Sequence, residues 1–100
     1  SWVNMSNWTF LSNHAHVLFL LCNHPDLRMR EIALQVQITE RAVQNIIHDL
    51  VEEGYLVVTK EGRRNHYEPQ LQQHLRHPLE SNITIGALIS GLQRKQKSAE

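Results

Sequence analysis

The fold is decided by one stretch of the sequence, REIALQVQITERAVQNIIHDLVEEGYLVVTKEGRRNHYEP (residues 30–69). Its first part, residues 30–36, predicts a short helix that is followed by a tight two-residue connection. Thr39 is a good N-cap for a longer helix that runs to Glu53, and Gly54 is suited to the position just after it. The apolar residues of this longer helix recur at i, i+3, i+4, i+7 and i+8, which predicts one buried face. They are Val43, Ile46, Ile47, Leu50 and Val51.

Beyond Gly54 the apolar residues recur at every second position, instead of with the 3.6-residue period of a helix. Residues 55–59 are rich in β-branched and aromatic side chains and predict a strand. Residues 60–63 predict a hairpin turn, and residues 64–68 predict the returning strand, which Pro69 ends. The sequence therefore predicts two helices followed by a two-stranded hairpin.

One helix is predicted before this stretch and another after it. Ser12 or Asn13 can cap a helix over residues 13–23, which is apolar on both faces and must therefore be covered on both. A last helix over about residues 84–96 carries its own apolar stripe. We expect a lead-in segment (1–11), a folded domain (12–69), a linker with about one helical turn (70–82) and a C-terminal helix (83–97).

Three helices followed by a hairpin is the element order of a winged helix-turn-helix. The ending LVEEGYLV (residues 50–57) resembles the pattern Leu-x-x-x-Gly-Tyr/Leu-Leu/Val of small prokaryotic winged-helix regulators of the MarR and ArsR type. The resemblance covers roughly residues 12–69. It implies an α+β, mainly helical fold with three helices, a two-stranded wing and an additional C-terminal helix. It also implies a regulator of transcription that reads double-stranded DNA with its third helix and its wing.

The outward face of the predicted third helix carries side chains that suit base edges. Arg41 can bind guanine, and Gln44 and Asn45 can bind adenine through two hydrogen bonds. Thr39, as the cap, leaves free backbone amides near a phosphate. The basic hairpin suits phosphates or a narrow minor groove. The predicted DNA-binding residues are Thr39, Arg41, Gln44, Asn45, His48, Arg28, Arg30, Lys60, Arg63 and Arg64.

The charge balance does not itself indicate a nucleic-acid partner, because the chain has ten basic and ten acidic residues. Three of the acids, Asp49, Glu52 and Glu53, are expected at the far end of the third helix, away from the duplex. A solvated helix face often carries the same residue types as a DNA-reading face. The alternative is therefore a winged-helix protein-interaction module in a transcription or assembly complex, which would retain a constant protein partner and no DNA.

The last helix and the doubly apolar first helix predict a homodimer, because both leave apolar surface to cover. A two-fold dimer would read a palindromic operator, and we expect a repressor. Any effector is expected to bind near the contact of the first and last helices. The predicted dimer-interface residues are Ile85, Leu88, Ile89, Leu92, Leu18 and Phe19.

The sequence predicts neither an enzyme nor a cofactor or metal site. It contains no glycine-rich phosphate loop, zinc-hydrolase motif or nucleophile elbow, so no catalytic residue is assigned. His14 and His16 point about 200° apart on a helix and cannot chelate one ion. The single Cys22 excludes an internal disulfide. No apolar run is long enough to span a membrane and no signal peptide opens the chain, so we expect a cytoplasmic protein.

Overall fold

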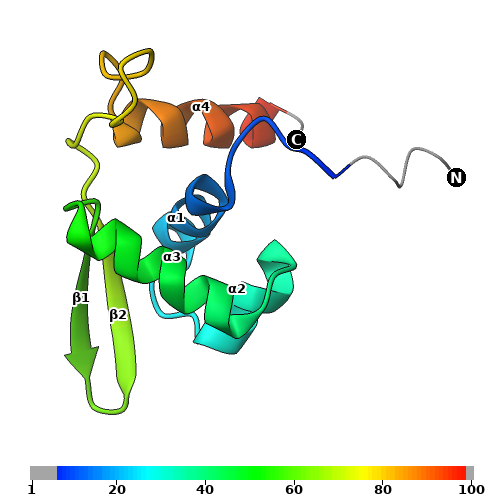
Figure 1. Cartoon of the computed structure of the whole chain (residues 1–100), viewed down its shortest axis with the longest axis vertical. Coiled ribbons are helices and arrows are strands. Elements are labelled where there is room, and N and C mark those ends of the chain that lie inside the picture. The colour runs from blue at the N-terminus through cyan, green and yellow to red at the C-terminus, as the bar shows by residue number, and fades with distance from the viewer. Residues whose placement is uncertain (1–6, 99–100) are drawn as a thin grey trace, which may run out of the picture.

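The computed structural model describes residues 7–98, with side chains described for residues 7–93. Residues 1–6 of the predicted lead-in segment lie outside this range. The described part of the chain forms a winged helix-turn-helix with one additional helix (Figure 1). None of its helices is long and apolar enough to cross a membrane. The elements are α1 (Asn13–Asn23), α2 (Met29–Val36), α3 (Glu40–Glu52), β1 (Leu56–Glu61), β2 (Arg64–Pro69) and α4 (Ile85–Ser98).

The starts of α1 and α3 follow from hydroxyl caps that the sequence predicts. The Ser12 hydroxyl accepts a hydrogen bond from Ala15 N (3.4 Å), and the Thr39 hydroxyl accepts one from Ala42 N (3.0 Å). Each cap satisfies a backbone amide that has no partner within the helix. Between α2 and α3 the chain turns sharply because Gln37 has a left-handed backbone, with φ of 68°. This turn sets the direction in which α3 leaves α2.

The wing is an antiparallel hairpin of β1 and β2. The strands pair from Leu56 opposite Pro69 to Glu61 opposite Arg64. The sequence predicts a four-residue turn, but β1 continues through residues 60 and 61 into the hairpin. The reason is Gly62, whose φ of +65° allows a two-residue turn to connect the strands. The wing is therefore longer than predicted and carries its basic tip further from the core.

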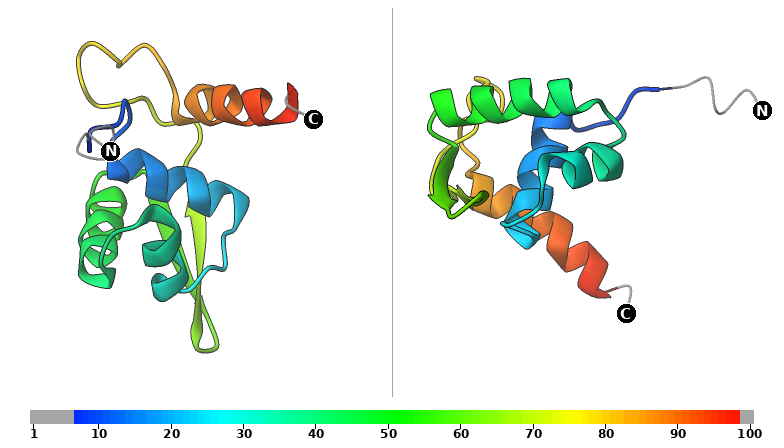
Figure 2. Two further views of the ribbon diagram at one scale, coloured as in Figure 1. Left: turned by 90° about the vertical axis from the view of Figure 1, so that its right-hand side faces the viewer. Right: turned by 90° about the horizontal axis from the view of Figure 1, so that it is seen from below.

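One core joins the helices to the base of the wing. Its fully buried side chains come from α1, α2, α3 and β1, and the largest are Leu21, Ile32, Leu56, Val17 and Val43. Ile85 and Ile89 of α4 belong to the same buried cluster, with 4% and 5% of their surface exposed. Helix α4 therefore packs against its own chain, across the end of the molecule opposite the wing tip (Figures 1 and 2).

The linker between β2 and α4 is tied to the folded domain by hydrogen bonds. The Tyr55 hydroxyl donates to the His74 carbonyl (2.7 Å), and Gly86 N donates to the Leu71 carbonyl (2.8 Å). A Cβ on Gly86 would lie 3.2 Å from that carbonyl oxygen, so glycine permits this close approach. Residues 70–84 form turns and an isolated bridge in place of the predicted helical turn.

Candidate nucleic-acid interface

Helix α3 is anchored by one face and presents the other to solvent. The anchoring face supplies four buried apolar residues to the core. Figure 2 (right) shows α3 along an outer edge of the molecule, with α1 and α2 on one side of it. Thr39 is exposed at its start, so the free amides of the first turn are open to an anion. The exposed side chains of the outward face are Arg41, Gln44, Asn45 and His48.

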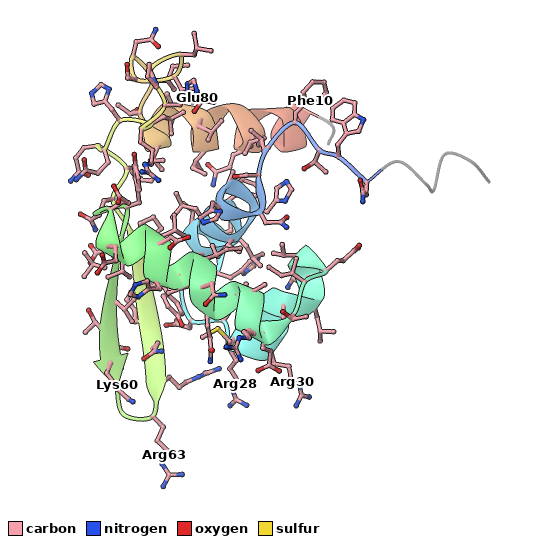
Figure 3. All side chains as sticks on the ribbon, viewed as in Figure 1. Phe10, Arg28, Arg30, Lys60, Arg63 and Glu80 are labelled. Carbon is pink, nitrogen blue, oxygen red and sulfur yellow. The ribbon has the colours of Figure 1, made fainter. Side chains whose placement is uncertain are left out.

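The basic residues of α2 and the wing lie at one end of the molecule. The side chains labelled at that end in Figure 3 are Arg28, Arg30, Lys60 and Arg63. Arg28, Arg63 and Arg64 line one hollow of about 290 Å³, together with the carboxylate of Asp26. Residues from the start of α2 and from the wing tip thus converge on one surface depression. Arginine side chains near one depression are suited to phosphate oxygens.

These basic side chains are not neutralised by acids of the described chain. Among residues 7–93, no ion pair involves any of the six basic residues predicted to bind DNA. Two acids at the end of α3 have other partners: Asp49 accepts from His14 Nε2 (2.8 Å), and Oε1 of the C-cap residue Glu53 lies 3.9 Å from Arg76 Nε. Both carboxylates therefore point toward α1 and the linker.

A polar cluster that the sequence does not predict lies between the wing and the loop before α2. His66 Nδ1 of β2 donates to Asp26 Oδ1 of that loop (2.8 Å). This hydrogen bond raises the pKa of His66 above its ordinary value, although partial desolvation of the ring opposes the rise. The Glu61 carboxylate of β1 lies beside the pair. Forty residues separate the bonded partners, so no local sequence pattern could have brought them together.

A larger cavity of about 620 Å³ lies on the opposite side of the fold from the basic hollow. It is enclosed by the start of α1, the end of α3, the linker and α4. Leu18, Leu50 and Leu88 contribute to a mainly apolar wall, and His14 and Arg76 add polar groups. Residues of both α1 and α4 line the cavity, which is where the sequence analysis expects any effector to bind. An effector at this position stays a prediction.

The family of this chain is decided by a match over its helical core and the start of the wing. The family model of the MarR family matches residues 9–64, which is more than half of the chain. The chain belongs to the MarR family. The MarR part of the predicted resemblance is thereby confirmed. Members of this family are transcription regulators rather than enzymes.

Three solved structures of transcription regulators show how much of a longer protein this chain resembles. The zinc-dependent regulator AdcR, solved with Zn(II) bound, is 28% identical, with a TM-score of 0.52 over 65% of this chain and 46% of that one. PcaV from Streptomyces coelicolor, solved with its natural ligand, is 22% identical, with a TM-score of 0.53 over 69% and 51% of the two chains. MepR, a regulator of the Staphylococcus aureus multidrug efflux pump MepA, is 17% identical, with a TM-score of 0.56 over 89% and 64%.

This MarR-family chain thus spans about half the length of AdcR and PcaV. No curated protein sequence matches it. The two relatives that are less than 25% identical support the fold alone.

The structure divides the residues predicted to form the dimer interface of this MarR-family chain into two groups. Leu18, Ile85 and Ile89 are buried in the chain's own core, and their role at a dimer interface stays a prediction. Ile85 and Ile89 of α4 belong to the same buried cluster as Leu18 of α1. Leu88, Leu92 and Phe19 keep part of their surface exposed. A dimer contact through these three remains a prediction.

Cys22 is half-buried in α1, where desolvation raises the pKa of its thiol. A raised pKa leaves little thiolate at neutral pH, which is the reactive form of cysteine. The structural environment therefore favours a packing role for Cys22 over a redox role.

Proposed function

We propose that this chain binds double-stranded DNA through α3 and the wing, acts as a homodimer on a palindromic operator, and represses transcription in the cytoplasm. The observation that carries the proposal is the exposed polar face of α3, flanked by arginines that have no acidic partner among residues 7–93. Membership of the MarR family supports it, because members of that family regulate transcription.

The dimensions of α3 suit the major groove. Thirteen residues at 1.5 Å each make a helix of about 20 Å, and the groove is about 12 Å wide. Arg41 and Asn45 lie one turn apart, so both reach base edges when α3 lies in the groove. Arg28, Arg63 and Arg64 contact phosphates, which fixes the position of α3 without selecting a sequence.

Selection of bound duplexes from a random DNA library tests the DNA part of the proposal. We expect a palindrome with half-sites about one helical turn apart. Gln44→Ala should cost about 1–3 kcal/mol of specific binding and relax base preference at one position of each half-site. Gln72→Ala is the matched control, because Gln72 is an exposed linker residue. A wild-type chain that enriches no duplex, while co-purifying with a constant protein partner, would favour the protein-interaction module.

The homodimer is supported by apolar surface that the described chain leaves exposed near α4. Phe10 and Leu79 are 94% and 86% exposed, in the segments that lead into α1 and α4. Leu92→Asp places a charge on the remaining open part of the α4 stripe. We expect this variant to sediment as a monomer and to lose most of its operator affinity, because two linked reading helices bind far more tightly than one. Leu34→Asp is the control, because Leu34 is an exposed residue of α2, and this variant should stay dimeric.

The 620 Å³ cavity supports regulation by a small, mainly apolar effector, since its size lies in the range of ligand pockets. The structure of PcaV was solved in complex with its natural ligand. Ala15 lines the cavity from α1. A compound that binds there should raise the Tm of the wild-type chain, and Ala15→Phe should abolish the rise by filling the space. A shift that persists in this variant would place the compound elsewhere.

A further inference from the structure

Three potential metal ligands from three separate segments meet at the side of the wing. Asp26 lies in the loop between α1 and α2, Glu61 ends β1, and His66 lies within β2. Each offers one ligand atom, and the three atoms all lie within 4.8 Å of one another. The strand register explains the meeting of the last two, because Glu61 pairs with Arg64 and side chains two residues apart share a face of the sheet.

The backbone holds the loop against the wing at this position. Tyr67 N of β2 donates to the Pro25 carbonyl (2.9 Å), which anchors the loop beside His66. The His66 ring is oriented by its hydrogen bond to Asp26. Glu61 has no ion-pair partner among residues 7–93, although arginines 63 and 64 are close in sequence. One imidazole and two carboxylates are therefore brought together, and one of these carboxylates, that of Glu61, makes no ion pair among residues 7–93.

We propose that Asp26, Glu61 and His66 form a binding site for a divalent transition-metal ion, such as Zn²⁺, that ties the wing to the loop before α2. Imidazole nitrogen and carboxylate oxygen are ligands that Zn²⁺ accepts at about 2.0–2.2 Å. Ligand atoms on one ion at these lengths lie about 3–4 Å apart, so closure from a spacing of up to 4.8 Å shortens the distances between ligand atoms by at most about 1–2 Å. Water completes the coordination, since all three side chains are open to solvent.

The binding step balances in charge and protons. The ion takes the place of the proton on His66 Nδ1. A protonated His66 releases that proton to solvent and keeps the one on Nε2, whereas a neutral His66 moves its proton from Nδ1 to Nε2 through solvent with no net release. The two carboxylates carry two negative charges, which the divalent ion neutralises. No change of oxidation state is involved.

The site adjoins the basic hollow, and this consequence rests on the proposed function. Asp26 lines the same hollow as Arg28, Arg63 and Arg64. Its carboxylate and that of Glu61 would repel a phosphate bound there. A bound ion removes this repulsion and fixes the wing, so it should raise DNA affinity about three- to tenfold.

Calorimetric titration of the full chain with Zn²⁺ alone tests the site without DNA. We expect one equivalent to bind to the wild type, with its affinity at least tenfold lower in Glu61→Gln and in His66→Gln. His77→Gln is the matched control, because His77 is an exposed linker residue whose ring, among the described residues, accepts one local hydrogen bond from Leu79 N. NMR of the same samples should show zinc-dependent shifts confined to residues near 26, 61 and 66, and confirms that each variant is folded.

Three outcomes would overturn the metal site. They are no binding to the wild type, equal binding to all variants, and shifts located away from the wing. The effect of the ion on DNA affinity is measured separately, with the selected duplex in the presence and in the absence of Zn²⁺. Zinc binding that depends on Glu61 and His66 but leaves DNA affinity unchanged supports the site and overturns its coupling to the basic hollow. DNA binding that is absent under all conditions overturns the proposed function and leaves the zinc result standing.

Discussion

Replacing Ile89 by alanine tests whether α4 belongs to the core of its own chain. Ile89 is 5% exposed, so the substitution removes three buried carbon groups. At about 0.8 kcal/mol per group, the lost transfer free energy is about 2.4 kcal/mol, and the unfilled cavity raises the total to about 3 kcal/mol. With an m-value of about 1.5 kcal/mol/M in urea, the unfolding midpoint should fall by about 2 M. Far-UV circular dichroism measures this midpoint directly.

Leu34→Ala is the matched control, because Leu34 is 71% exposed and lies outside the proposed dimer contact. Its midpoint should shift by no more than about 0.3 M, which corresponds to about 0.5 kcal/mol. The measurement is repeated at protein concentrations that differ tenfold. A core role for Ile89 leaves the difference between variant and wild type unchanged, whereas a role in a partner contact makes it depend on concentration. Equal shifts for Ile89→Ala and Leu34→Ala would refute the packing of α4 on its own chain.

Three further changes test the wing, a turn and the thiol. Arg63→Ala should weaken binding to all DNA sequences alike. It should also make the slope of log K against log salt shallower by about 0.9 per lost phosphate contact. The control Arg76→Ala should leave both the affinity and the slope unchanged. Gln37→Gly should stabilise the chain by about 0.5–1 kcal/mol, because glycine adopts the positive φ of 68° without strain, and a lower Tm would contradict this. Cys22 should react with iodoacetamide at pH 8 more slowly in the folded chain than in urea, because burial raises its pKa, and equal rates would show an open thiol.

The elements that local chemistry decides were predictable from the sequence. Thr39 caps α3 as expected, because a hydroxyl at that position satisfies an amide three residues on. Gly54 follows α3 with a φ of +80°, a conformation that favours glycine. The change of hydrophobic period after it marks the wing. Signals of this short range predict the winged helix. The LVEEGYLV ending supplies the resemblance to regulators of the MarR and ArsR type.

Features that depend on distant contacts were not predictable in the same way. The apolar stripe of α4 shows that the helix must be covered, but it does not distinguish a partner chain from α1 of the same chain. The structure resolves this for Ile85 and Ile89, which are buried internally. The contact between Asp26 and His66 joins positions forty residues apart, and it depends on how the loop before α2 meets the wing. Hydrophobic periodicity carries no information about such pairs.

The hydrogen bonds of Tyr55 connect the base of the wing to α3 and to the linker that leads to α4. Tyr55 lies three residues after the end of α3, and its N donates to the Leu50 carbonyl of that helix (2.8 Å). Its own carbonyl accepts from Gln70 N (2.9 Å), and its hydroxyl donates to the linker that leads to α4. We therefore expect a tilt of α4 to move both α3 and the wing through this residue. With six residues at about 3.3 Å each, the wing extends about 20 Å from this point, so a rotation of about 5° displaces its tip by about 1.7 Å. A displacement of this size is enough to make or break a hydrogen bond to a phosphate at the tip.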